Sequence, residues 1–256
     1  METSILNSFF NAIEGNVFNS MNEKTMKEEK FDLSFVKGHP TISINGKIYV
    51  VDTGSPASFS YAGTIPLLGS EYTVPYGEFI LDDLNRVLET RVDGLIGGEI
   101  LKRVGAVEFD YPHNTITFHD ILPDVSGSAE IDVRVFLNYL VFDMEIDGQQ
   151  RRVFLDSGAP IPYLCNTILP KREPDGYVED VTPSGSFSSP VYEMESELAG
   201  KMFNVRYGKL PAAHQVMARI MNCQGVIGKD IFIRGKVIIS YQKEKMYIQL
   251  NDEFIN

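Results

Sequence analysis

Two aspartates of this chain stand in nearly the same short sequence. Asp52 and Asp156 each follow an apolar stretch and precede a small hydroxyl residue and a glycine, in residues 50–55 and 154–159. Two carboxyl groups held side by side cannot both ionise cheaply, so such a pair retains one proton. The ionised group can then take a proton from water, while the protonated group supplies one to a carbonyl oxygen or a departing amine. These residue types therefore predict hydrolysis by an activated water molecule.

A second pair of matching blocks follows the two aspartate runs. Residues 93–101 follow the first run and residues 224–232 follow the second, and each block has two apolar residues between glycines. The chain thus contains two copies of one unit, and each copy delivers one carboxyl group. A single Asp-hydroxyl-Gly triplet is also typical of an ordinary turn. The duplication, together with the matching second block, favours a functional pair.

These motifs resemble the aspartic peptidases, and their duplication resembles the two-lobed pepsin-like type. The retropepsin-like type reaches the same geometry by dimerisation of a single lobe. The resemblance covers residues 31–122 and 132–250. It implies an all-β fold with two pseudo-symmetric β lobes, to which the sequence adds an N-terminal helical segment. It also implies that a monomer is sufficient for the active site and that no cofactor and no metal is needed.

The resemblance assigns a role to each residue of the two runs. Asp52 and Asp156 are implied to be catalytic. The hydroxyl groups of the residues after them would bond across to the backbone of the opposite loop, and the glycines would let the backbone approach the carboxylates closely. The supporting loop is implied to consist of Thr53, Gly54, Ser55, Ser157 and Gly158.

The two runs differ at the residue after the glycine. Ser55 has a hydroxyl group that can donate to Asp52, whereas Ala159 has none for Asp156. A hydrogen bond to the ionised form of a carboxyl group favours ionisation. We therefore expect Asp52 to carry the charge and Asp156 to carry the shared proton.

The chain divides into four segments. Residues 1–30 are an N-terminal amphipathic helix or extension, residues 31–122 a first β lobe, residues 123–131 a linker and residues 132–256 a second β lobe. In the first segment, apolar residues recur at three- and four-residue steps between residues 5 and 21. That helix packs on the body or on a partner, serves as a removable pro-segment or touches a membrane surface.

Each lobe is expected to contain matching hairpins. Asn45-Gly46 and Asp147-Gly148 predict tight turns just before the two aspartates. A short helix over residues 100–103 and a closing hairpin in each lobe, around residues 112–114 and 242–245, complete the pattern. The interval between aspartate and matching block is 42 residues in the first lobe and 69 in the second. The second lobe therefore has more room: residues 182–190 predict a turn-rich tip, and residues 191–197 and 202–207 predict strands around Ala199-Gly200. We expect the loop that covers the cleft to come from this lobe.

Composition narrows the function classes. The 256 residues contain 23 Lys and Arg against 35 Asp and Glu, a net charge of −12, which argues against nucleic-acid binding. No apolar run is long enough for a membrane span, and no signal peptide is recognisable, so we expect an intracellular protein unless such a peptide has been removed. Cys165 and Cys223 are expected to be free and buried, with a bridge between them left open.

Other polar residues are not expected to take part in catalysis. The four histidines, His39, His113, His119 and His214, lack metal-ligand spacing. Asp82 and Asp83 are interpreted as a solvated pair.

The sequence thus predicts an aspartic endopeptidase that cleaves a peptide or protein substrate in a cleft between lobes. The alternative is a catalytically inert pepsin-like module that binds peptides or proteins, suggested by the short first lobe. A third possibility keeps the chemistry and makes residues 1–30 an inhibitory segment.

Overall fold

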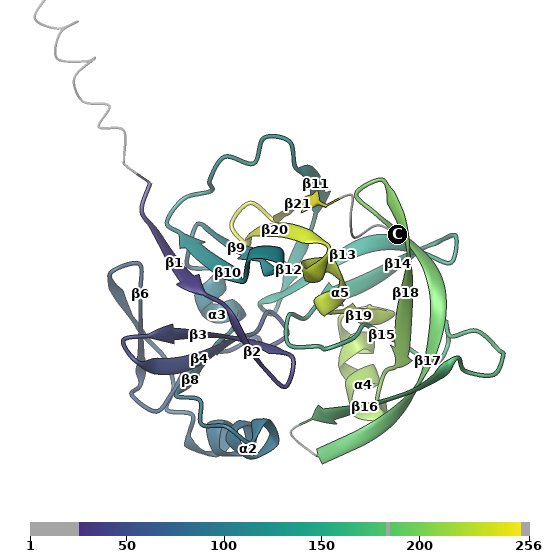
Figure 1. Ribbon diagram of the computed structural model, residues 1–256, viewed down its shortest axis with the longest axis horizontal. Coiled ribbons are helices and arrows are strands. Elements are labelled where there is room, and N and C mark those ends of the chain that lie inside the picture. The colour runs from purple at the N-terminus through teal and green to yellow at the C-terminus, as the bar shows by residue number, and fades with distance from the viewer. Residues whose placement is uncertain (1–25, 183–184, 252–256) are drawn as a thin grey trace, which may run out of the picture.

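The computed structural model describes residues 26–182 and 185–251 (Figure 1). The described residues are mostly β-strand, arranged in several sheets, with few helices. The helix expected between residues 5 and 21 lies outside the described residues. We call residues 31–122 the first half and residues 132–251 the second half.

Five strands of the first half form one sheet. In spatial order they are β2 (Ser34–Val36), β3 (His39–Ile44), β4 (Lys47–Val51), β8 (Gly94–Ile96) and β5 (Phe59–Ser60). β3 and β4 form the predicted hairpin, and both residues of its turn, Asn45 and Gly46, have positive φ angles, as a type I′ turn requires. β4 runs parallel to β8, so the chain leaves both strands at the same edge of the sheet.

An eight-stranded sheet occupies the second half. Its order is β12 (Arg134–Phe136), β13 (Tyr139–Ile146), β14 (Gln149–Leu155), β19 (Gly225–Ile227), β15 (Tyr163–Leu164), β18 (Lys201–Lys209), β17 (Gly185–Leu198) and β16 (Gly176–Thr182). The predicted hairpin at Asp147-Gly148 joins β13 to β14. β14 runs parallel to β19, as β4 does to β8 in the first half.

A six-stranded sheet joins strands of both halves (Figure 1). Its order is β1 (Glu28–Asp32), β10 (Thr115–His119), β9 (Ala106–Asp110), β20 (Gly235–Ser240), β21 (Lys245–Leu250) and β11 (Ala129–Asp132). The two closing hairpins predicted from the sequence are β9–β10 and β20–β21, and β9 pairs directly with β20. β1 begins inside the segment expected to be an N-terminal extension, and β11 lies largely inside the expected linker.

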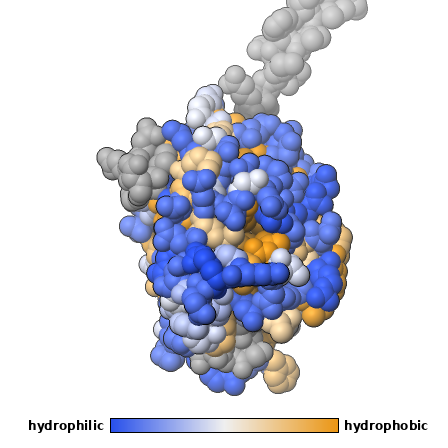
Figure 2. Space-filling model, turned by 90° about the vertical axis from the view of Figure 1, so that its right-hand side faces the viewer, coloured by the Kyte–Doolittle hydropathy of each residue, from blue (hydrophilic) through white to orange (hydrophobic). Residues whose placement is uncertain are grey.

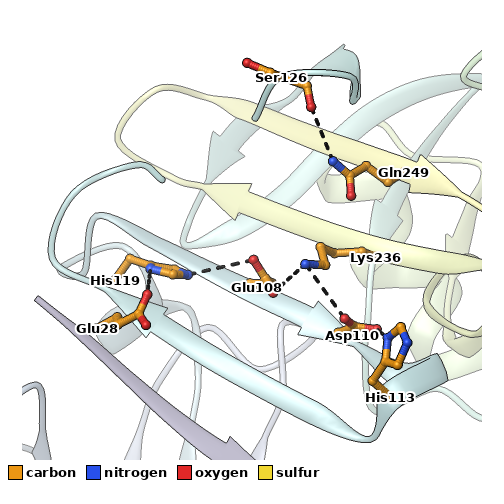
Figure 3. Close-up of polar contacts among 8 residues, drawn as sticks. All are labelled: Glu28, Glu108, Asp110, His113, His119, Ser126, Lys236 and Gln249. Carbon is orange, nitrogen blue, oxygen red and sulfur yellow. Dashed lines mark hydrogen bonds and ion pairs between the residues drawn. The ribbon is translucent and has the colours of Figure 1, made fainter. Parts of the chain in front are cut away.

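Charged side chains connect four strands of this sheet (Figure 3). Lys236 of β20 lies 3.0 Å from Glu108 and 3.8 Å from Asp110, both on β9. His119 of β10 lies 3.6 Å from Glu28 of β1 and 4.0 Å from Glu108. Burial lowers the pKa of His119, although the neighbouring carboxylates act in the opposite direction. Two of the four histidines, His119 and His113, which bonds to Asp110, therefore belong to the sheet rather than to the cleft.

The remaining elements are short. They are the hairpin β6 (Thr64–Leu67) and β7 (Ser70–Thr73), the helices α2 (Glu78–Leu88), α3 (Gly98–Leu101), α4 (Ala212–Ile220) and α5 (Lys229–Ile233), and the 3-10 turn η1 (Tyr111–His113). The short helix expected at residues 100–103 is present as α3, which begins two residues earlier. Leu81 and Leu88 of α2 pack against Val50 and Leu95 of the five-stranded sheet. In the described ranges, no helix has the length and apolar character needed to cross a membrane.

The largest hydrophobic cluster contains side chains from all three large sheets, among them Val51, Phe109 and Leu155, and Phe232 of α5. Val51 and Leu155 are the last residues of β4 and β14, so the cluster extends to the positions just before Asp52 and Asp156. The outer side of the second half is mostly hydrophilic, with only a few apolar areas (Figure 2). Burial of apolar area across all three sheets fixes the two halves against each other.

Candidate functional site

The two aspartates occupy equivalent places in their sheets. Asp52 follows β4, and its backbone N–H donates to the carbonyl oxygen of Ile96 at the end of β8 over 2.9 Å. Asp156 follows β14, and its N–H donates to Ile227 at the end of β19, also over 2.9 Å. Each aspartate loop is thus held by the matching block from its own half, as the sequence pattern led us to expect.

The residues after the aspartates bind the two loops to each other. The N–H of Thr53 donates to Oγ of Ser157 over 3.0 Å, and the N–H of Ser157 donates to Oγ1 of Thr53 over 2.9 Å. The hydroxyl groups donate onward, that of Thr53 to the carbonyl of Leu155 and that of Ser157 to the carbonyl of Val51. Both side chains are fully buried. The expected bonds across the two loops are therefore present, in a reciprocal arrangement that leaves each hydroxyl both donating and accepting.

This arrangement brings the two carboxyl groups together. Oδ1 of Asp52 and Oδ1 of Asp156 each lie 3.2 Å from the point where a Cβ atom of Gly158 would stand, so the two carboxyl groups lie side by side. Burial raises the pKa of Asp156 well above its usual range, and the charge and hydrogen bond of Asp52 raise it further. The backbone N–H groups of Gly158 and Ala159 donate to Asp156 and act in the opposite direction, but burial is the larger effect. The pair is therefore suited to holding one proton, with Asp156 as the group that retains it.

The two glycines of the triplets leave room for the carboxyl groups. A Cβ atom added to Gly54 would lie 2.2 Å from Cγ of Asp156, far inside any real contact. A Cβ atom added to Gly158 would lie 3.2 Å from Oδ1 of Asp52, from Oδ1 of Asp156 and from Nδ1 of His39. The two positions therefore both require a small residue, Gly54 more strictly than Gly158.

The expected hydrogen bond from Ser55 to Asp52 is not formed. Ser55 does not donate its hydroxyl proton to Asp52, because its Oγ donates to the carbonyl oxygen of Ala57 over 2.9 Å. Asp52 instead accepts the backbone N–H of Gly54 over 2.8 Å. A hydrogen bond from Ser55 to Asp52 was therefore the wrong reason to expect the proton on Asp156. Burial of Asp156, and not a hydroxyl on its partner, favours the proton there.

The carboxyl pair lies in a cleft of about 490 Å³ between the halves. Apolar side chains make up much of its lining: Val50, Ile80, Leu84, Leu95, Phe154, Phe187, Leu210, Met217 and Val226. The first half contributes part of one wall through α2, and the second half contributes the opposite wall through the β16–β17 hairpin and α4 (Figure 1). The sequence predicted that a loop of the second half would cover the cleft. In the structure, the β16–β17 hairpin of the second half lines it, and α2 of the first half lines it too. A cleft of this size and polarity is typical of a binding site.

Sequence reasoning missed two residues beside the carboxyl pair. His39 is the first residue of β3 and Tyr139 the first residue of β13, so the two hold equivalent positions in the two halves. Both line the cleft. Burial, followed by the charges of both aspartates, raises the pKa of Tyr139. The sequence signal for both residues is that each directly follows a turn, at the start of a strand. His39 was considered only as a metal ligand.

The turns that precede these two residues reach across to the opposite loop. A Cβ atom on Gly38 would lie 3.5 Å from Cβ of Pro160, which follows the second aspartate run. The side chain of Asn138 donates to the carbonyl of Pro56, which follows the first run, over 2.9 Å. Each half therefore supports the aspartate loop of the other.

Several other predicted residues lie apart from the carboxyl pair. Asp82 accepts a hydrogen bond from Tyr61, whereas Asp83, although exposed, lines the edge of the cleft. Cys165 and Cys223 are both free, as expected, but only Cys223 is buried, whereas Cys165 is partly exposed. Burial raises the pKa of Cys223 to about 12. Among the described residues there is no cluster of His, Cys, Asp or Glu that has the arrangement of a metal site.

Comparisons with known proteins give only weak structural similarities. No family model matches the chain, and no curated protein matches it. The solution structure of the simian foamy virus protease is similar over 35% of this chain and 87% of that chain, with 18% identity and a TM-score of 0.27. A foamy viral protease-reverse transcriptase in complex with an RNA/DNA hybrid is similar over 36% of this chain and 11% of that chain, with 18% identity and a TM-score of 0.28. Similarities at this level do not establish a shared fold or a shared activity.

Proposed function

We propose that this chain is an aspartic endopeptidase of the two-lobed type, with Asp52 and Asp156 as its catalytic residues. The observation that carries the proposal is the pair of adjacent carboxyl groups in one cleft, supplied by two loops that bond reciprocally to each other. Thr53, Gly54, Ser157 and Gly158 support the pair, whereas Ser55 stabilises its own loop. Each chain carries both aspartates, so one copy is sufficient for activity.

The chemistry follows from the unequal protonation of the pair. A water molecule bound between the carboxyl groups loses a proton to Asp52 as its oxygen attacks the carbonyl carbon of the peptide bond. Asp156 gives its proton to the carbonyl oxygen, and a tetrahedral diol forms. The diol then collapses: one of its hydroxyl groups returns a proton to Asp156 as the carbon–nitrogen bond breaks, and Asp52 gives its proton to the leaving amine. The carboxyl groups end the cycle sharing one proton, without a covalent intermediate.

Peptide digestion tests this proposal. We expect the full chain to cut a random peptide library between pH 3 and 7 and to be inhibited by pepstatin. Asp52→Ala and Asp156→Ala should each abolish cleavage while the circular dichroism spectrum stays that of the folded protein. Asp124→Asn, which changes a carboxylate outside the cleft, should cut like the wild type. Cleavage that survives both alanine substitutions would refute the assignment.

The alternative of a non-cutting binding module predicts a different outcome. Its motivation was a cleft left open by the short first half, but α2 places Ile80 and Leu84 along that side. Binding of library peptides without any product, at every pH in the range, would favour the module over the peptidase.

A further inference from the structure

A carboxylate and two aromatic rings meet at the wall of the cleft formed by the β16–β17 hairpin. Asp180 of β16 and Phe187 of β17 are directly paired across this hairpin, and both line the cleft. The hydroxyl of Tyr163 donates to Oδ2 of Asp180. The rings of Tyr163 and Phe187 lie 6.1 Å apart at an angle of 49°. We call these three residues the hairpin subsite.

The hairpin subsite lies next to the carboxyl pair. Burial raises the pKa of Tyr163, and the hydrogen bond and charge of Asp180 raise it further, as does the charge of Asp156. Asp156, Tyr163, Asp180 and Phe187 all line the same cleft, so a peptide bound at Asp156 has the hairpin subsite within its binding site.

The acidic residues of the cleft outnumber the basic ones. Four lining residues are aspartates, of which Asp83 pairs with Arg86 and Asp156 retains the shared proton, which leaves Asp52 and Asp180 as its acidic groups. The described lining has no Lys or Arg, and its basic residues are His39 and His214. Low-dielectric walls strengthen the field of such groups and concentrate ligands of the opposite sign. An acidic substrate side chain would be repelled here, and a basic one attracted.

We infer that the hairpin subsite selects a Lys or Arg side chain of the substrate, close to the bond that is cut. The aliphatic stem of such a side chain would pack on the two rings, and its charged head would pair with Asp180. The rings also offer a cation a favourable face. This inference rests on the proposed function, since it assigns a substrate class to the same cleft.

Matched substrates test the selection. Cleavage sites in the peptide library are mapped first, and two peptides are then made that differ only in Lys or norleucine at the position showing a basic preference. Because a hydrogen bond to a charged group contributes about 1.5–3 kcal/mol, we expect the wild type to favour the Lys peptide in kcat/KM by about tenfold or more. Asp180→Asn should reduce this ratio to about threefold or less.

Two further variants separate charge from structure. Asn at position 180 can still accept the hydroxyl of Tyr163, so the change removes the charge and keeps a hydrogen-bond acceptor. Tyr163→Phe keeps both rings and the carboxylate, so the preference for Lys should persist. Glu179→Gln changes an exposed carboxylate on the same strand and should leave the ratio at the wild-type value.

The outcomes distinguish this inference from the proposed function. Cleavage by the wild type with no basic preference at any position, or an equal preference in Asp180→Asn, would overturn the subsite and leave the peptidase standing. If no peptide is cut at all, the peptidase fails, and fluorescence anisotropy of labelled Lys and norleucine peptides decides the subsite. Tighter binding of the Lys peptide, lost in Asp180→Asn, supports the inference, and equal binding contradicts it.

Discussion

In the first half, Gly94 lies 42 positions after Asp52, and the segment between them forms β5, the β6–β7 hairpin and α2. In the second half, Gly225 lies 69 positions after Asp156, and the segment between them forms β15, β16, β17, β18 and α4. The aspartate loops at the start of these segments are nevertheless fixed by the same hydrogen bonds. The two loops constrain each other, since each hydroxyl bonds the backbone of the opposite half, whereas α2 packs on the sheet of the first half and β16 and β17 belong to the sheet of the second.

The largest expected effect comes from the two glycines of the triplets. Gly54→Ala places a methyl group 2.2 Å from Cγ of Asp156, whereas Gly158→Ala places one 3.2 Å from the nearest atoms. Displacement of a reacting group by about 1 Å costs about 100-fold in rate, so we expect at least that loss in kcat/KM for Gly54→Ala. Gly158→Ala should lose about tenfold. Equal losses would show that the two loops tolerate crowding alike and would remove this distinction.

The reciprocal bonds between the loops predict matched losses of stability. Thr53→Val and Ser157→Ala each leave a buried backbone N–H without its hydroxyl partner. Each should lower the free energy of unfolding by about 1–3 kcal/mol, measured by urea denaturation. Because each hydroxyl bonds the other residue's N–H, the double variant should lose less than the sum of the two. Strictly additive losses would mean that the loops are supported independently.

The raised pKa of Asp156 predicts a dependence of stability on pH. A carboxyl group whose pKa is higher in the folded than in the unfolded state stabilises the fold only while it stays protonated. Its contribution is present below about pH 4 and is lost as pH rises through the folded pKa. Asp156→Asn cannot ionise, so it should be more stable than the wild type at pH 7, with the difference shrinking toward pH 3. Thermal melting across this range measures the effect, and a difference that grows toward acid would contradict the sign.

The smallest expected effect concerns the wall of the first half. Ile80 of α2 lines the cleft, whereas its neighbour Phe79 is 87% exposed and does not. Ile80→Ala should lower kcat/KM for an apolar peptide by roughly threefold, because part of the buried apolar contact is lost. Phe79→Ala serves as the matched control and should change neither kcat/KM nor the melting temperature appreciably. A larger effect at Phe79 would mean that the substrate extends over the outer side of α2.

Local sequence signals were sufficient for the loops and the hairpins. Asn45-Gly46 and Asp147-Gly148 specify tight turns through their positive φ angles, and alternating apolar residues specify the strands around them. α2 also had a signal, since Leu81, Leu84 and Leu88 recur at helical spacing. This helix was not among the predicted elements.

Other features of the site had no local signal. Whether the hydroxyl of Ser55 turns to Asp52 or to Ala57 depends on the conformation of the whole loop. The place of His39 depends on contact between the two halves, and the contacts of Asp180 depend on the register of a hairpin far along the chain. Such placements arise from tertiary packing, which a linear pattern does not contain.

The equivalent positions of His39 and Tyr139 have a consequence for the orientation of a bound peptide. In a symmetric dimer of identical lobes, a bound peptide meets the same groups whichever way it runs, so both orientations are equally good. Here the two equivalent positions, both in the lining of the cleft, hold an imidazole and a phenol. A peptide bound as proposed would therefore meet different surroundings in its two orientations.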